Sequence, residues 1–335
     1  MKAITYRRYG TPDVLQVEEV PTPTPKDDEV CIKIHAAEAT KSDCELRSFR
    51  FPVSWFWLPL RLAMGMFKPR KPILGGYFAG EVTAAGAGVT RFAPGDRLFG
   101  STQFRLGAYG EYVCLPEHYT LVRIPDTLTS EEAAAVPLGG LNALHFMNSA
   151  GITPGETVLI NGAGGSIGSF AVQIAKAMGA EVTAIDAGHK EARLREIGAD
   201  HFIDYTRDNV AQGGPIYDVI LNMVARNGFT ASLRQLKPKG RYLLGNPRLL
   251  DLLRAPLTNH FTNKRVVTAF AGEKQSELET LATMIEAGSI CPLIDRIYPM
   301  NQAPQAHLRV ETEQRVGCVV IAMREAEHDH KNHYA

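Results

Sequence analysis

The sequence has no excess of charge of either sign and no long uninterrupted hydrophobic run. Its 335 residues include 36 Lys and Arg and 36 Asp and Glu. The formal net charge of +0 argues against a nucleic-acid partner held by bulk electrostatics. The longest apolar stretch, residues 51–67, is interrupted by Pro52, Pro59 and Arg61. We therefore expect no integral membrane segment.

Cysteine is scarce and scattered. The five cysteines (Cys31, Cys44, Cys114, Cys291 and Cys318) form no CxxC pair, and an odd number cannot all be paired within the chain. We therefore expect reduced thiols and a cytoplasmic protein. A strand-like pattern starts at Met1, so no secretory signal peptide is expected. With 45% hydrophobic and 21% charged residues, the composition is that of a globular protein long enough for two domains.

The stretch from Thr157 to Asp186 has the strongest local pattern in the chain. Residues 157–161 form the short β-branched apolar run of a buried strand, and a glycine-rich turn follows. Apolar residues then recur along 167–178 with the period of a helix packed on a sheet. Gly179 is expected to end that helix in a left-handed conformation. A second strand, 181–185, is followed directly by an acidic residue, Asp186.

This order of strand, glycines, helix, strand and acid predicts a dinucleotide-binding unit. Small residues in the turn let the backbone approach a pyrophosphate, and the helix N-terminus presents free amides to it. A carboxylate after the second strand can accept hydrogen bonds from the ribose hydroxyls. A glycine pattern alone could also be a tight turn without a ligand. The expected cofactor contacts are Ala163, Gly165, Ser166, Ile167, Gly168 and Asp186.

The rest of the chain divides into a strand-rich part and a part in which strands and helices alternate. Residues 1–123 read as short strands, at 1–6, 15–20 and 30–34 among others, and predict a β-barrel-like domain. From an N-cap predicted at Ser130 up to residue 274, alternation predicts a parallel sheet covered on both faces. The expected strands of that sheet are 157–161, 181–185, 201–203, 217–221, 241–244 and 266–271, with helices near 190–197 and 228–236.

The last part of the chain, residues 275–335, is expected to return to the first domain. It contains one helical pattern and two strand-like runs, 293–298 and 317–323. The predicted domains are therefore 1–123, 124–274 and 275–335. The end of the chain holds His328, His330 and His333, which we interpret as a frayed polar end rather than a metal-binding tail.

These features together resemble the medium-chain dehydrogenase/reductase superfamily, and within it the zinc-free quinone oxidoreductase branch. The resemblance covers essentially the whole chain. The matching stretches are GAYGEYVCLPEHYTLVRIPDTLTSEEAAAVPLGGLNALHF (107–146), PGETVLINGAGGSIGSFAVQIAKAMGAEVTAID (154–186), REIGADHFIDYT (195–206) and LKPKGRYLLGN (236–246).

The resemblance implies an α/β fold: a Rossmann-type doubly wound parallel sheet plus a GroES-like β-barrel catalytic domain. It implies a homodimer, for which residues 266–271 are a candidate edge strand. The further expected cofactor contacts are Asn142, Lys190, Tyr205 and Gly245.

The resemblance also identifies the positions at which zinc-containing relatives bind their catalytic metal. Those enzymes use a cysteine, a His-Glu pair and a second cysteine, where this chain has Thr40, Gly76 with Tyr77, and Gly139. A catalytic zinc needs three side-chain ligands, and glycine offers none. We therefore expect no metal site.

Hydride transfer without a zinc Lewis acid suits acceptors that are already activated. The resemblance therefore implies an NAD(P)H-dependent reductase of a small lipophilic quinone or α,β-unsaturated carbonyl. The hydroxyls of Thr40, Ser42 and Tyr77 are candidate donors to the developing oxyanion. The branch usually has Asn in place of Thr40 and often an acid in place of Tyr77.

Asp43 and Arg47 match the Asp-x-x-x-Arg spacing of the branch. Asp43 is therefore a candidate catalytic residue, and a structural ion pair with Arg47 is the alternative. Two other functions stay open: a zinc-free alcohol or aldehyde oxidoreductase, and a cofactor-binding structural or sensor protein with little catalysis.

Asp186 bears on the choice between NADH and NADPH. A carboxylate accepts the ribose hydroxyls but repels a 2′-phosphate, by roughly 1 to 4 kcal/mol at about 4 Å. This predicts a preference for NADH of about tenfold or more. His189, Lys190 and Tyr205 could favour the phosphate, but Lys190 is expected to be solvated in the first turn of its helix.

Residues 46–80 contain both tryptophans of the chain, Trp55 and Trp57, and no Asp or Glu. Prolines interrupt this aromatic and basic segment. One hypothesis is a mobile flap that offers apolar area to a lipophilic acceptor. An ordinary covering helix and loop, or association with a membrane surface, are the alternatives.

Overall fold

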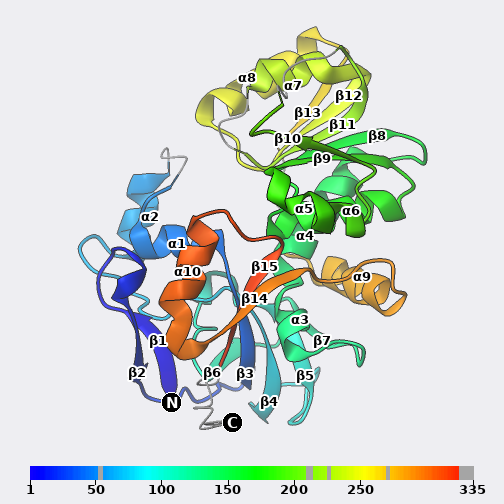
Figure 1. Cartoon of the computed structure of the whole chain (residues 1–335). Helices are drawn as coiled ribbons and strands as arrows, with labels where there is room; N and C mark the ends of the chain where they lie inside the picture. The colour runs from blue at the N-terminus through cyan, green and yellow to red at the C-terminus, as the bar shows by residue number, and fades with distance from the viewer. Residues whose placement is uncertain (52–55, 209–213, 225–227, 269–271, 324–335) are drawn as a thin grey trace, which may run out of the picture.

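The computed structural model describes residues 1–51, 56–208, 214–224, 228–268 and 272–323. Figure 1 shows two sheet-containing parts that meet where β15, α4 and α5 come together. Trp55, residues 269–271 and the histidine-containing tail lie outside the described residues. Among the residues that are described, no helix is long and apolar enough to cross a membrane.

The dinucleotide-domain sheet has six parallel strands in the order β10-β9-β8-β11-β12-β13. The chain moves outward from β8 in both directions, so a crevice is expected at the carboxyl ends of β8 and β11. The predicted Rossmann-type parallel sheet is confirmed. The strands are β8 (Thr157–Asn161), β9 (Glu181–Asp186), β10 (His201–Asp204), β11 (Tyr217–Asn222), β12 (Leu236–Leu244) and β13 (Arg265–Val267).

Helices cover both faces of this sheet. Val158 and Ile160 point to a core with α4 and α5, whereas Leu159 points to a core with α7 and α8. Alternate residues of β8 are therefore buried on opposite faces, which explains its continuous apolar run. The helices are α4 (Pro137–Ala150), α5 (Ser166–Ala177), α6 (Glu191–Glu196), α7 (Phe229–Gln235) and α8 (Leu249–Phe261).

The catalytic-domain sheet has the order β14-β15-β3-β4-β5-β7, and β6 also pairs with β3. β1 (Lys2–Tyr6) and β2 (Leu15–Glu19) form a separate antiparallel pair. The other strands are β3 (Glu29–Ala39), β4 (Tyr77–Ala85), β5 (Arg97–Ser101), β6 (Tyr112–Pro116), β7 (Leu121–Arg123), β14 (Ile294–Pro299) and β15 (Cys318–Ala322). β15 lies antiparallel to β3, so the end of the chain joins the strands of its beginning.

Five further helices lie on or beside this sheet: α1 (Lys41–Ser48), α2 (Trp57–Met64), α3 (Ser130–Ala134), α9 (Gln275–Glu286) and α10 (Ala303–Glu311). Short 3₁₀ turns are η1 (Pro12–Val14), η2 (Gln103–Arg105), η3 (Gly188–Lys190) and η4 (Met300–Gln302). α2 shows that part of the 46–80 segment is a helix. The sequence did not predict α8 or α10.

The N-cap of α3 is Thr129, so the prediction of Ser130 was wrong by one residue. The Thr129 hydroxyl accepts a hydrogen bond from Glu132 N, and the Glu132 carboxylate accepts one from Thr129 N. This capping box requires a Glu three residues after the cap, which Thr129 has and Ser130 lacks. The predicted left-handed Gly179 after α5 is confirmed, with φ +83.

Candidate active site

The turn between β8 and α5 fits a dinucleotide pyrophosphate. Gly165 is the N-cap of α5, and no side chain caps the first turn of this helix. A Cβ on Gly168 would lie 2.2 Å from Gly162 O, so only glycine lets the helix lie this close to the turn. A Cβ on Gly165 would meet nothing nearer than 3.7 Å, so space is open beside the helix terminus. Free backbone amides at an open helix N-terminus are suited to an anion.

Asp186 holds this turn from the end of β9. Its Oδ2 accepts a hydrogen bond from Gly164 N (2.7 Å), and its Oδ1 accepts one from Ala187 N (2.8 Å). The ammonium of Lys190 pairs with Oδ1 at 2.8 Å. The carboxylate therefore shapes the turn, and its charge is balanced by a lysine.

The expectation that Lys190 is solvated was wrong, because this residue is only 4% exposed. The 3₁₀ turn η3 carries the chain back after β9 and places the lysine over the glycine-rich turn. A Cβ on Gly164 would lie 2.5 Å from Lys190 Cδ. Glycine at position 164 thus leaves room for the lysine side chain above the turn.

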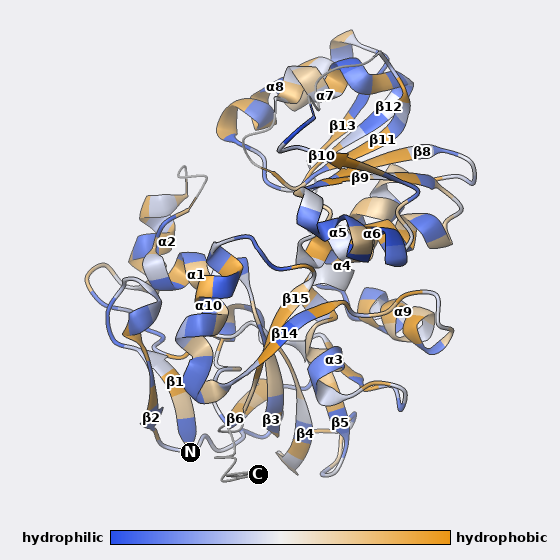
Figure 2. Cartoon of the chain, viewed as in Figure 1, coloured by the Kyte–Doolittle hydropathy of each residue, from blue (hydrophilic) through white to orange (hydrophobic). Residues whose placement is uncertain are grey.

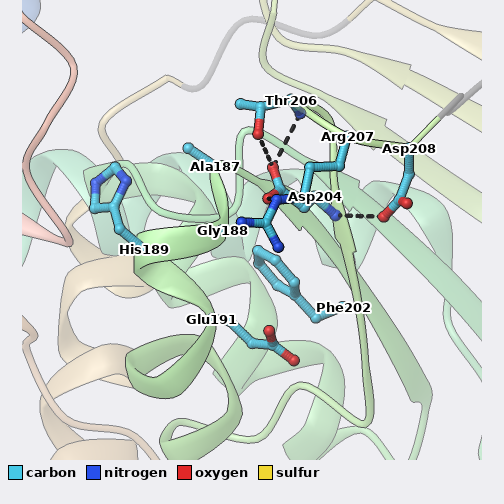
Figure 3. A pocket seen from close by; sticks show the side chains of 9 residues that line it. All are labelled: Ala187, Gly188, His189, Glu191, Phe202, Asp204, Thr206, Arg207 and Asp208. Atoms are coloured by element: carbon cyan, nitrogen blue, oxygen red, sulfur yellow. Dashed lines mark hydrogen bonds and ion pairs between the residues drawn. The ribbon is translucent and has the colours of Figure 1, made fainter.

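An open pocket of about 510 Å³ lies beside the carboxyl ends of β9 and β10. Figure 3 shows its lining: Ala187, Gly188, His189, Glu191, Phe202, Asp204, Thr206, Arg207 and Asp208. The lining contains three carboxylates, one arginine and one histidine, so negative charge predominates in the pocket. Tyr205 lies at its edge, 57% exposed, and its backbone N donates to Asp186 O (3.3 Å).

Two other predicted cofactor contacts have clear structural surroundings. Gly245 follows β12, and a Cβ there would lie 2.4 Å from Met223 Sδ. Asn142 lies within α4, and its side-chain amide donates to Leu138 O (2.9 Å) in the same helix. Gly245 therefore lies at the sheet edge that carries the crevice, whereas the amide of Asn142 satisfies its own helix.

Arg315 is a site residue that the sequence analysis missed. It lies between α10 and β15, is 7% exposed, and its Nη1 donates to Val310 O (3.0 Å). A Cβ on Gly165 would lie 3.9 Å from Arg315 Nη2, and Gly317 N donates to Gly164 O (2.9 Å). The returning segment thus brings a buried cation to the pyrophosphate turn. No local motif signals this contact.

Glu38 on β3 is a second residue that was missed. Its side chain is completely buried, and its Oε1 accepts a hydrogen bond from Ser166 Oγ (2.6 Å). Its Oε2 has no hydrogen-bond partner among the described residues. Burial raises the pKa of Glu38 to about 7, although Ser166 and the charge of Arg315 act in the opposite direction. An ionisable group of the catalytic domain therefore touches the cofactor helix.

Thr40 acts as the N-cap of α1. Its Oγ1 accepts from Asp43 N (3.0 Å) and donates to Asp43 Oδ2 (2.6 Å). Asp43 also accepts from Gly75 N (3.0 Å), so it ties α1 to the glycine pair before β4. Burial raises the pKa of Asp43, and these hydrogen bonds oppose the rise. Ser42 is exposed in the first turn of α1.

Arg47 pairs with Glu311 rather than with Asp43 among the ion pairs of the described chain, so the ion pair proposed from sequence was wrong. Arg47 is fully buried and also donates to Gly10 O (2.9 Å) and to His307 Nδ1 (3.2 Å). Burial, helped by the arginine charge, lowers the pKa of His307 to about 3. A neutral His307 accepts from Arg47, and this network joins α1 to α10.

Tyr77 and Ser101 share one carboxylate. They face each other in register on β4 and β5, and their hydroxyls donate to the two oxygens of Glu273 at 2.7 Å each. Thr120 Oγ1 donates to the backbone oxygen of Glu273. Glu273 was missed from sequence because 196 positions separate it from Tyr77. These contacts tie the segment before α9 to the catalytic domain.

Tyr77 lies in a largely buried environment beside negative charge. Burial raises the pKa of Tyr77 well above its usual value, and the charge and hydrogen bond of Glu273 raise it further. The charges of Glu38 and Asp43 act in the same direction. The Tyr77 hydroxyl therefore stays protonated and can donate a hydrogen bond.

Of the candidate metal positions, Gly139 lies at a close contact between two helices. A Cβ on Gly139 would lie 2.6 Å from Ser166 O, so α4 approaches α5 through this glycine. Within the described ranges, no group of three His, Cys, Asp or Glu side chains could hold a metal ion.

Comparisons with known proteins agree with this architecture. Residues 26–126 match the family described as alcohol dehydrogenase GroES-like domain, and residues 197–321 match the family described as zinc-binding dehydrogenase. The chain is 30% identical over 345 residues to a quinone oxidoreductase from Pseudomonas aeruginosa, covering 96% of this chain and 99% of that one. It aligns with the structure of a quinone oxidoreductase from Coxiella burnetii with a TM-score of 0.84 and 27% identity, over 97% and 99% of the two chains.

A much longer relative also matches. The chain is 33% identical over 269 residues to the polyketide synthase GfsB from Streptomyces halstedii. The matched region covers 78% of this chain but only 5% of that protein. The chain therefore corresponds to a small part of that enzyme.

The GroES-like domain, the parallel dinucleotide-binding sheet and these relatives define the class. The chain belongs to the medium-chain dehydrogenase/reductase superfamily, in its quinone oxidoreductase-like branch. It is an NAD(P)H-dependent oxidoreductase.

Proposed function

We propose that this enzyme reduces quinones or α,β-unsaturated carbonyl compounds without zinc. The observation that supports the proposal is the donor set on β4 and β5. It consists of the hydroxyls of Tyr77 and Ser101 with the carboxylate of Glu273, while Gly76 and Gly139 stand at the ligand positions of zinc relatives. Such a site can position an acceptor oxygen but cannot polarise an alcohol through a metal.

The chain's own residues divide the task between them. The backbone amides at Ser166 and Ile167, with Arg315, hold the pyrophosphate. The bound nicotinamide supplies the hydride. Tyr77 turns its hydroxyl from Glu273 to the substrate oxygen and donates a hydrogen bond as negative charge develops there. Ser101 keeps the Glu273 carboxylate in place.

We propose that NADH is favoured over NADPH, but by less than the tenfold inferred from an isolated carboxylate. Lys190 balances the charge of Asp186, which weakens the repulsion of a 2′-phosphate. A phosphate would also have to draw Lys190 away from Asp186. The negative charges of Asp204 and Asp208 in the neighbouring pocket also repel the 2′-phosphate of NADPH.

The same proposal includes a cytoplasmic homodimer. β13 is one of the two edge strands of the described dinucleotide-domain sheet, which leaves it available to a second copy. The five cysteines carry no disulfide, which supports a reducing compartment.

The test is a turnover assay that follows nicotinamide absorbance over quinones, enals, aldehydes and alcohols, with elemental analysis of the same preparation. We expect turnover of quinones or enals, no stoichiometric metal and no effect of chelators. Activity confined to alcohols and aldehydes would replace this proposal with the alcohol oxidoreductase alternative. One equivalent of zinc whose removal abolishes activity would contradict zinc independence. Tight cofactor binding without turnover would favour a sensor protein.

A further inference from the structure

Helix α8 turns its apolar face away from the protein. Its buried positions are Asp251, Ala255 and Thr258. Its exposed positions include five large apolar residues, the α8 stripe: Leu249 (53% exposed), Leu250 (63%), Leu253 (60%), Leu257 (57%) and Phe261 (76%). At 3.6 residues per turn these five lie within about 120° of arc. A surface helix normally has the opposite arrangement.

Polar contacts attach this helix to its domain, together with the packing of Ala255 in the core that contains Leu159. Asn259 receives a hydrogen bond from Val266 N (2.6 Å) and donates one to Val266 O (3.0 Å). Asp251 accepts from Arg248, which closes the first turn. The leucines of the stripe therefore contribute little to the fold of this chain. An exposed apolar stripe of this extent marks an interaction surface.

A second apolar surface lies on the catalytic domain around α2. This α2 patch consists of Trp57 (38% exposed), Leu58 (55%), Leu62 (54%), Phe67 (92%) and Phe104 (90%). Lys71 Nζ donates to Phe104 O and so joins the loop of Phe104 to the end of the segment that carries α2. Figures 1 and 2 show α2 at the left of the catalytic domain and α8 at the left-hand edge of the dinucleotide domain, with apolar residues along α8.

Both surfaces are carried by stretches of the chain that contain several basic residues and at most one acid. Residues 46–80 contain no Asp or Glu, and residues 248–265 contain one acid, Asp251, which is buried and paired with Arg248. The exposed Lys and Arg residues of these ranges outside β13 are Arg50, Lys68, Arg70, Arg248 and Arg254. In a chain with a net charge of +0, this is a local concentration of positive charge.

We propose that the α8 stripe and the α2 patch together dock the enzyme on an anionic lipid membrane. Apolar side chains with a basic rim and aromatic residues are the chemistry that inserts into a lipid interface and pairs with anionic headgroups. A second copy seated on this same face would bring two basic rims of like charge together, whereas the homodimer proposed above would use the edge of β13. This proposal does not depend on the substrate: the membrane would be a binding partner whether or not the enzyme reduces quinones.

The experiment is co-sedimentation of the full chain with vesicles of phosphatidylcholine alone or mixed equally with phosphatidylglycerol. The test variant is Leu250→Gln/Leu253→Gln/Leu257→Gln. The control is Ile216→Gln/Ile297→Gln/Leu308→Gln, whose residues are 49%, 46% and 53% exposed but lie outside both surfaces. We expect the native protein and the control to bind mixed vesicles more tightly than neutral ones, and less tightly as salt rises. The α8 variant should bind at least tenfold more weakly, with unchanged turnover in solution.

A second measurement needs no variant. Both tryptophans lie in residues 46–80, so their emission should shift to shorter wavelength on mixed vesicles and be quenched by brominated acyl chains. Absence of binding to mixed vesicles, or equal loss in the test and control variants, would overturn the proposal. So would a native oligomer that the α8 variant dissociates while neither protein binds vesicles, because the stripe would then be a self-interface.

Discussion

Lys190 Nζ lies 2.8 Å from Asp186 Oδ1, and the two residues are only 4% and 6% exposed. A nearly buried ion pair therefore stands where the ribose of the cofactor is expected. Removing one partner of such a pair leaves an uncompensated charge, which costs more than removing both. The selectivity for the cofactor should consequently depend on the pair rather than on either residue alone.

The first prediction concerns this pair. Lys190→Met should lower kcat/KM for NADPH at least tenfold more than for NADH, because Asp186 then repels the 2′-phosphate without compensation. Asp186→Ser should shift the ratio about tenfold toward NADPH, because Lys190 becomes free to bind the phosphate. The double variant, which has neither charge, should return near the native ratio. Single variants with the native ratio would show that this pair does not determine the choice.

The second prediction concerns the carboxylate shared by Tyr77 and Ser101. Tyr77→Phe should lower kcat for a quinone or enal by about 10²-fold or more, as is typical for loss of one oxyanion donor. The KM for the cofactor should stay unchanged. Glu273→Gln should raise kcat several-fold, because the amide removes a negative charge that opposes the developing oxyanion.

Ser101→Ala is the matched control, since it removes a hydroxyl from the same carboxylate on the neighbouring strand. It should change kcat less than Tyr77→Phe does. If the three variants share the same kcat as the native enzyme, Tyr77 is not the donor.

The third prediction concerns Glu38 and pH. Its pKa of about 7 in the folded protein exceeds the usual value of 4.5, so the native state binds the proton more tightly than the unfolded state. The stabilisation is therefore fully present below pH about 4.5 and is lost as pH rises through about 7. At about 1.4 kcal/mol per pH unit, the difference between these pKa values corresponds to about 3 kcal/mol.

Urea unfolding of the native protein and Glu38→Gln, at pH about 5 and about 8, measures this loss. The variant should lose less stability between the two conditions. Glu45, whose pKa burial also raises to about 7, titrates in the same window and is present in both proteins. A variant with the same pH dependence as the native protein would contradict the assignment to Glu38.

The fourth prediction concerns Arg47. Arg47→Ala should lower the free energy of unfolding by about 3 to 5 kcal/mol, because Glu311 and Gly10 O lose a buried partner. Arg47→Lys should recover part of the loss, since one ammonium can pair with Glu311 but cannot reach all three partners. Thermal and urea unfolding measure the effect. A stable Arg47→Ala protein with greatly reduced kcat would instead favour a catalytic arginine.

Some features of this protein could be predicted from short stretches of sequence. The strand, glycine turn, helix and acid of residues 157–186 predict a Rossmann-type unit because each depends on neighbours within a few residues. Gly168 and Gly179 are needed for local backbone reasons, a close approach and a positive φ. The helix α8 was missed although its leucines follow the helical period, because it contains Pro256, a residue that normally interrupts a helix.

The sequence by itself therefore determined the fold class, the dinucleotide turn and the lack of a zinc ligand set at the positions of zinc relatives, because these depend on residue type and short spacing. Only the tertiary structure decided which side chains meet in the site. Glu273 reaches Tyr77 across 196 positions, and Arg315 reaches the glycine turn through a returning strand. The tertiary structure also decided where the Lys190 side chain points. A 3₁₀ turn and a glycine beneath this side chain let it pair with Asp186 instead of extending into water.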